Sequence, residues 1–126
     1  MITSFVNRTG SPLIPLRYAD QDLMAVVDSG FRGDLELPET FLGAASQDFI
    51  GSVESDLAGG QQIEEDVYQV EIDFDGSLMT VETTFADTSM ALVGTRLMKE
   101  HRLQIDFVHK TLSLKRSLDT VAQDDS

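Results

Sequence analysis

Hydrophobic and polar residues alternate along much of this chain with the two-residue period of β-strands. The period is clearest over residues 67–74 and 78–85. The Asp75-Gly76 pair between these segments is a strong hairpin signal, because both residues tolerate the positive φ angles of a tight turn. The pattern therefore predicts two antiparallel strands joined by a short turn.

Shorter apolar runs predict further strands near both ends of the chain. Polar turns separate them at residues 19–22 and at His109 and Lys110. The expected strands cover residues 13–16, 23–27, 103–107 and 112–114. Most of the regular structure is therefore expected to be β.

Two segments have the pattern of short helices. Pro38 suits the first position of a helix over residues 38–45, and Thr95 suits the capping position before residues 96–101. The predicted fold class is thus mainly β with one or two short helices. His101 is expected at the C-terminal end of the second helix, where a cation is favourable.

The chain length is that of a single domain. Its 126 residues fall in the usual range, and we place the domain at residues 1–116. Residues 117–126 are mostly polar and end in Asp124, Asp125 and Ser126. We expect this acidic tail to be disordered, because it has few apolar residues to bury.

The net charge excludes several classes of function. The chain has 22 acidic and 9 basic residues, giving a formal charge of −13. Nucleic acids and anionic membranes bind through Lys and Arg, so neither is an expected partner. With no Cys and only two His residues, we expect no metal site and no cofactor.

The sequence also suggests where the protein resides. Its N-terminus lacks a basic segment followed by an apolar one, and no apolar run approaches the ~20 residues that span a bilayer. We therefore expect a soluble protein of the cytoplasm.

Acidic residues are concentrated in the middle of the chain. No Lys or Arg lies between Arg32 and Arg96, whereas Asp and Glu are frequent there. One interpretation is a solvated acidic face that maintains solubility, and the other is a surface that prefers basic substrates.

The most informative local sequence is an apolar strand that ends in Asp28, Ser29 and Gly30. An ordinary turn after a strand has the same residue types, so the tripeptide alone is ambiguous. A second feature, Leu92-Val93-Gly94, follows about sixty residues later. The two features in this order are far more specific than either alone.

Together these motifs resemble the retropepsin-like aspartic proteases of clan AA. Asp28-Ser29-Gly30-Phe31 is similar to the Asp-Ser/Thr-Gly-Phe motif of a small bacterial and archaeal group. The resemblance spans about residues 13–114 and implies a closed β-barrel with one lobe per chain. It also implies that Leu92, Val93 and Gly94 pack behind the catalytic loop.

The resemblance further implies an aspartic endopeptidase that acts on a peptide or protein substrate. Its catalytic residues would be Asp28, Ser29 and Gly30. Phe31 and the tip of a flap hairpin, at Ala58, Gly59 and Gly60, would bind substrate.

Because the chain has one such motif, the resemblance also implies a two-fold homodimer in which each subunit contributes Asp28. Two adjacent carboxylates share one proton, as aspartic proteases generally illustrate. One Asp28 would activate water while the other protonates the substrate, and the Ser29 hydroxyl would hold the two loops together.

Other functions remain open on the sequence. The chain could be a catalytically weak or inactive module that dimerises or binds peptides, because a fold does not determine a function. It could also be an unrelated monomeric β-barrel. A Ser-His-Asp triad with His101 or His109 is disfavoured, since no Gly-x-Ser-x-Gly elbow is present.

Overall fold

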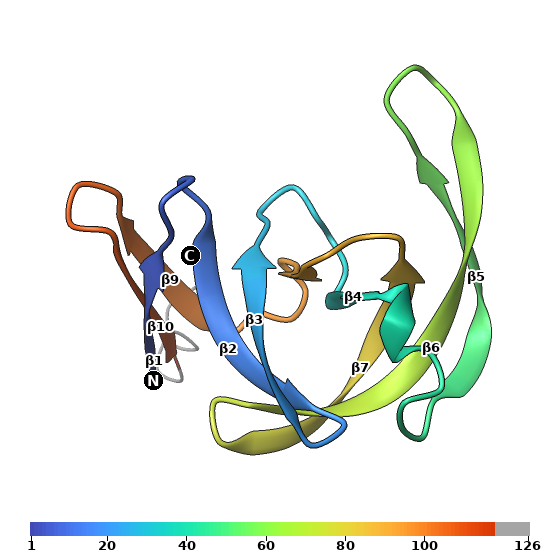
Figure 1. Ribbon diagram of the computed structural model, residues 1–126, viewed down its shortest axis with the longest axis horizontal. Helices are drawn as coiled ribbons and strands as arrows, with labels where there is room; N and C mark the ends of the chain where they lie inside the picture. Colours follow the sequence, from blue (N-terminus) through green and yellow to red (C-terminus); the bar gives the residue numbers. More distant parts are fainter. Residues whose placement is uncertain (118–126) are drawn as a thin grey trace, which may run out of the picture.

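The computed structural model describes residues 1–117 and consists almost entirely of β-strands (Figure 1). A single 3₁₀ turn, η1 (Glu39–Phe41), is the only helical element in this part of the chain. The strands are β1 (Ile2–Val6), β2 (Pro12–Tyr18), β3 (Gln21–Val27), β4 (Leu35–Pro38), β5 (Asp48–Asp56), β6 (Gln62–Phe74), β7 (Ser77–Ala86), β8 (Ala91–Val93), β9 (His101–Asp106) and β10 (Thr111–Arg116). The predicted mainly β class is confirmed.

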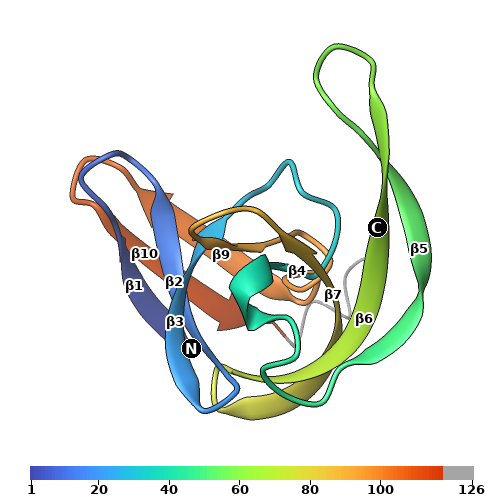
Figure 2. The same cartoon turned by 45° about the vertical axis from the view of Figure 1, so that its right-hand side comes forward.

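The strands form one strongly curved sheet. Its order is β5-β6-β7-β4-β8-β3-β2-β1-β10-β9, with β5 and β9 at the two ends. An additional pairing between Arg17 of β2 and Asp73 of β6 links strands that are distant in this order. The sheet thus turns back on itself, as the crossing of β2 and β6 shows in Figures 1 and 2.

The two hairpins with clear sequence signals are both present. β6 and β7 pair up to Phe74 and Ser77, and Asp75 and Gly76 have φ angles of 54° and 78°. β2 and β3 also form a hairpin, with a tighter turn than expected. Only Ala19 and Asp20 lie outside the pairing, and both have positive φ.

The helix predictions are wrong in most respects. Over residues 38–45 only η1 is helical, and Pro38 is the last residue of β4. The Gln47 side chain accepts a hydrogen bond from Gly43 N and donates one to Phe41 O, at 2.8 Å each. These bonds satisfy backbone groups that a longer helix would use.

The second predicted helix, over residues 96–101, is absent. Residues 95–100 form turns, and His101 begins β9 instead of ending a helix. Thr95 N and Arg96 N donate hydrogen bonds to Phe31 O and Gly33 O, at 2.8 and 3.2 Å. Bonds to a distant loop therefore replace the local bonds that the sequence favoured.

The core lies inside the curve of the sheet. Many apolar side chains are fully buried there, each contributing about 1.5–3 kcal/mol relative to exposure. The largest fully buried apolar side chains are Phe74, Ile14, Leu35, Leu37, Ile72, Leu114, Val70 and Val93. Several of these belong to β4, β8 and β6, so the core fixes the strands that surround the Asp28 loop.

The described chain ends just after β10. Ser117 N donates a hydrogen bond to Glu100 O at 2.8 Å. The remainder of the predicted tail, residues 118–126, lies outside the described part. Within residues 1–117, no helix has the length and hydrophobicity needed to cross a membrane.

Candidate active site

Asp28 begins the loop that leads from β3 to β4. Both strands pair with β8, which lies between them in the sheet. β3 is parallel to β8 with Val27 beside Val93, whereas β4 is antiparallel to it with Leu35 beside Val93. The loop of residues 28–34 therefore leaves and rejoins the sheet at the same buried residue of β8.

Backbone hydrogen bonds fix the position of Asp28. Its N–H donates to Val93 O at 3.0 Å, and its carbonyl accepts from Phe31 N at 3.1 Å. The carboxylate Oδ1 accepts a hydrogen bond from Gly30 N at 2.9 Å. Asp28 is half-buried, whereas Ser29 and Gly30 are exposed, so the carboxyl group is held at the edge of the loop.

Three successive residues after β8 hold the rest of the loop. Gly94 N donates to Asp34 O at 3.0 Å, in addition to the bonds from Thr95 and Arg96 to Phe31 and Gly33. A Cβ atom at Gly94 would clash with Gly33 O and lie 2.6 Å from Phe31 O. The structure thus brings Val93 and Gly94 directly against the Asp28 loop, while Leu92 pairs with Val26 and Glu36.

Asp34 is a buried anchor that sequence reasoning missed. Only 8% of it is exposed, and its Oδ2 accepts a hydrogen bond from Glu82 N at 2.9 Å. Arg96 Nε lies 3.8 Å from Asp34 Oδ1, and its guanidinium binds Glu82 at 2.7 Å. A lone acid between Gly33 and the buried strand β4 is the only sequence signal that pointed to this role.

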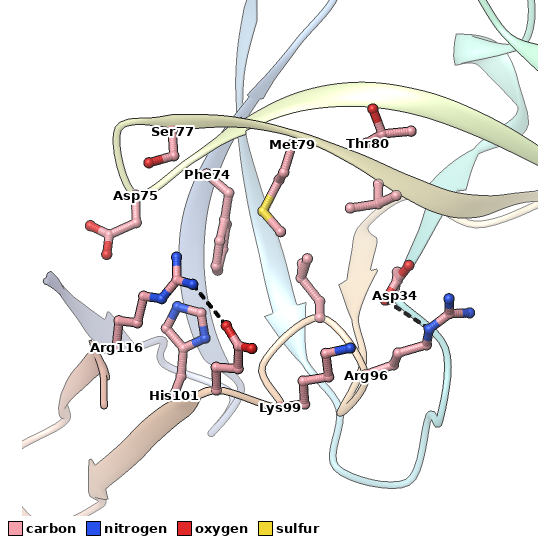
Figure 3. Close-up of a pocket in the computed structure, with 13 residues that line it drawn as sticks. Asp34, Phe74, Asp75, Ser77, Met79, Thr80, Arg96, Lys99, His101 and Arg116 are labelled. Carbon is pink, nitrogen blue, oxygen red and sulfur yellow. Dashed lines mark hydrogen bonds and ion pairs between the residues drawn. The ribbon is translucent and has the colours of Figure 1, made fainter. Parts of the chain in front are cut away.

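Asp34 and Arg96 also line a small cavity of about 250 Å³ (Figure 3). His101 lines it and packs its ring 5.7 Å from that of Phe74, and its Nδ1 is buried without a hydrogen-bond partner among residues 1–117. Burial lowers the pKa of His101, because it disfavours the imidazolium form. Neither Asp28 nor Ser29 lines this cavity, so nothing in its geometry supports a Ser-His-Asp triad.

The predicted flap corresponds to the hairpin of β5 and β6, which projects from the body of the molecule (Figure 1). Ala58, Gly59 and Gly60 lie at its exposed tip, and both glycines have positive φ. The turn is closed by a hydrogen bond from Leu57 N to Gln61 O at 2.7 Å.

A larger cavity of about 610 Å³ connects the Asp28 loop with the side of this hairpin, along the strand residues that precede and follow its tip. The loop contributes Gly30 and Phe31, and the hairpin contributes Val53, Glu65 and neighbouring residues. Phe31 is half-buried, and its ring packs close to Gly33 and Gly94. The predicted substrate residue Phe31 therefore borders this cavity, while the hairpin tip does not.

Negative charge surrounds Asp28. Glu36 pairs with Leu92 of β8 and with Thr84 of β7, in the middle of the strands that hold the loop. Its pKa is raised, mainly because burial disfavours the ionised form and further because Glu65 and Asp28 are negatively charged. The Glu36 side chain makes no hydrogen bond or ion pair within residues 1–117. The region of Asp28 thus contains a second carboxyl group, that of Glu36, close enough for the two charges to interact.

Comparison with known proteins identifies the fold. No protein-family model and no curated protein matches the sequence. Among solved structures, the chain is similar to the solution structure of the simian foamy virus (mac) protease, with a TM-score of 0.57 and 20% identity. The match covers 69% of this chain and 91% of that one, and it shows a retropepsin-like fold.

Replacing Gly94 by Ala tests the close packing behind the loop. Because both clashing atoms belong to the backbone, we expect Gly94→Ala to lower the free energy of unfolding by about 3 kcal/mol or more. Gly43→Ala is a matched control, because it faces open space and would cost only about 1–2 kcal/mol for its left-handed φ. Equal losses in chemical denaturation would contradict the packing argument.

Replacing Glu36 by Gln tests the charge around Asp28. A raised pKa means that ionised Glu36 destabilises the fold at neutral pH, and this penalty disappears as the pH falls through the raised pKa. We therefore expect Glu36→Gln to raise the free energy of unfolding by about 0.5 kcal/mol at pH 7 and by less near pH 4.

Denaturation of the Glu36→Gln variant across this pH range, with exposed Glu71→Gln as control, provides the measurement. A gain that grows on acidification would show that the like-charge argument is wrong.

Proposed function

We propose that this protein is an aspartic endopeptidase that hydrolyses peptide bonds with water activated by two copies of Asp28. The observation that carries the proposal is the placement of Asp28, whose backbone is bonded to Val93 at the end of a buried strand. This carboxylate stands at a loop edge in a retropepsin-like fold. The two motifs noted in the sequence are thus joined by a direct hydrogen bond.

The proposed site requires two chains. The sequence contains one Asp-Ser-Gly, because Asp75-Gly76-Ser77 has a different order and Asp87-Thr88-Ser89 lacks the glycine. A two-fold dimer supplies the second carboxylate, and such dimers are the commonest oligomers. We also propose that the strands linked by the pairing of β2 with β6 form the closed barrel of one lobe, as in the small bacterial and archaeal group.

The proposed mechanism uses the two carboxyl groups differently. Two carboxylates a few ångströms apart resist simultaneous ionisation, so they share one proton. The ionised Asp28 takes a proton from water, which attacks the carbonyl carbon of the scissile bond. The protonated Asp28 of the partner subunit donates a hydrogen bond to the carbonyl oxygen. When the C–N bond breaks, the same group gives its proton to the leaving amine nitrogen, so that the pair again holds one proton.

Groups beside Asp28 assist this chemistry. The N–H of Gly30 holds one carboxylate oxygen, and we propose that the hydroxyl of Ser29, an exposed residue, links the two loops across the dimer axis. Glu36 adds a further carboxyl group to this region, and its own pKa is raised mainly by burial and further by the charges of Glu65 and Asp28.

Substrate would lie in the cavity between the Asp28 loop and the β5–β6 hairpin. Phe31 borders this space, and Glu65 gives it acidic character. Closure of the hairpin would bring backbone N–H groups of Ala58, Gly59 and Gly60 onto the substrate. The left-handed φ angles of the two glycines allow the tight tip that this contact requires.

One observation favours a second candidate function. Glu36 lies close enough to Asp28 for their negative charges to repel, and a second Asp28 would add to this repulsion. A protein with the same cavity but little hydrolytic activity would act as a dimerisation or peptide-binding module. Peptide binding by the wild type without cleavage would favour this alternative.

Replacing Asp28 by Asn tests the catalytic assignment, because it preserves shape and removes the ionisable group. We expect the cleavage rate of a diverse peptide mixture, followed by mass spectrometry between pH 4 and 7, to fall by at least about 10³-fold. Asp20→Asn is a suitable control, since Asn tolerates the positive φ of that turn position. Undiminished cleavage by the Asp28→Asn variant would eliminate the proposed mechanism.

A further inference from the structure

The turn between β9 and β10 displays two large apolar side chains to solvent. Val108 is 85% exposed and Phe107 is 60% exposed. Phe5 of β1 is 47% exposed and pairs with Thr111, the first residue after the turn. Phe5, Phe107 and Val108 are called the apolar turn below.

The exposure of these side chains is built into the turn. Asp106 Oδ1 accepts hydrogen bonds from Val108 N and His109 N, both at 3.0 Å. The other carboxylate oxygen lies 2.7 Å from His109 Nδ1. These bonds lower the pKa of Asp106, so the carboxylate that fixes the turn stays ionised. The apolar side chains are therefore held outward by a fixed backbone.

The turn also borders a broad depression of about 890 Å³ over β1, β9 and β10. Ile105, Phe107 and Val108 line one side of it, and Thr3 and Ser4 line another. β9 is the last strand of the sheet, so one of its edges has no neighbouring strand in residues 1–117. An apolar turn beside an open strand edge is typical of an interaction surface.

The position of the apolar turn in the molecule indicates which partner could bind to it. The β9–β10 turn, the β1–β2 loop, the Asp28 loop and the tip of the β5–β6 hairpin all lie at the same end of the molecule (Figures 1 and 2). Because the proposed reaction needs a second Asp28, a second copy must approach at this end. The apolar turn is exposed at this same end, where it is accessible to that copy.

Charge also favours this part of the surface for self-association. Residues 34–87 contain 14 Asp and Glu and no Lys or Arg, whereas residues 101–117 contain four Lys and Arg and one Asp. Two copies that each carry a charge of −13 repel one another least where acidic residues are fewest. The apolar turn lies in that region.

We propose that the apolar turn is a contact surface for a second copy of this chain, adjoining the paired Asp28 loops. The proposal rests on the proposed function, because the need for a second Asp28 identifies the occupant. An isologous contact of this kind buries Phe107 and Val108 of both copies near the two-fold axis. It makes the β9–β10 turn part of the assembly of the site without contact with substrate.

Replacing Val108 by Asp tests this surface. Leu78→Asp is the matched control, because Leu78 is 69% exposed at the β6–β7 hairpin, at the opposite end of the molecule (Figure 1). Light scattering over a range of concentrations should show the dissociation constant of the dimer rising about tenfold or more for Val108→Asp only. Unchanged dimerisation of that variant, equal weakening by Leu78→Asp, or a wild type that is always monomeric would overturn the proposal.

Cross-linking gives an independent measurement. The chain contains no Cys, so Val108→Cys and Leu78→Cys each introduce a single thiol. A bifunctional maleimide should join Val108→Cys chains into dimers and leave Leu78→Cys chains monomeric. Equal yields for the two variants would contradict the proposed contact.

These measurements separate this inference from the proposed function. If the wild type cleaves peptides and Val108→Asp chains still dimerise, the apolar turn is not the contact although the enzyme assignment stands. If Val108→Asp dissociates the dimer but no chain cleaves any peptide, the contact stands and the peptidase assignment fails.

Discussion

The arrangement of the candidate site depends on the backbone hydrogen bonds between residues 94–96 and the Asp28 loop. Gly94, Thr95 and Arg96 donate to Asp34, Phe31 and Gly33 in turn. Only glycine fits at the first of these positions, because a side chain would collide with the loop carbonyls. β8 inserts between β3 and β4, so a segment distant in sequence fixes both ends of the loop. The orientation of Asp28 is therefore a property of the whole sheet.

The same arrangement concentrates negative charge. Asp34 is satisfied by Glu82 N and lies near Arg96, so its burial is compensated. The Glu36 side chain has no such partner within the described residues, and its pKa is raised mainly by burial and further by the charges of Glu65 and Asp28. In the proposed dimer, a second copy would bring another Asp28 carboxyl group beside the first, and two carboxylates at short distance share one proton. The protonation of Asp28 would therefore depend on whether two chains associate.

Local signals predicted part of this structure and long-range contacts determined the rest. The Asp75-Gly76 hairpin was predictable, because its turn residues and alternating strands encode it locally. The strands β1, β4, β5 and β8 were missed, since β1, β4 and β8 are short and β5 has little buried surface. The helix expected after Thr95 is replaced by bonds to the Asp28 loop, which no local pattern reveals.

The residues of the candidate site, like the strands, were only partly predictable from the sequence. Asp28 could be read from the apolar strand that precedes it, and Gly94 from the resemblance of Leu92-Val93-Gly94 to a family motif. The roles of Asp34 and Glu36 could not, since each depends on strands that are adjacent only in the folded sheet. The exposure of Val108 likewise depends on the bonds that Asp106 makes within its turn.

The central claim is that one active site contains Asp28 from two chains. It is tested most directly by mixing and re-equilibrating wild-type chains with Asp28→Asn chains at constant total concentration and measuring peptide cleavage. If both copies are required, activity falls with the square of the wild-type fraction, to about one quarter in an equal mixture. Activity that falls only in proportion to the wild-type fraction would show that a single Asp28 suffices and would contradict this account.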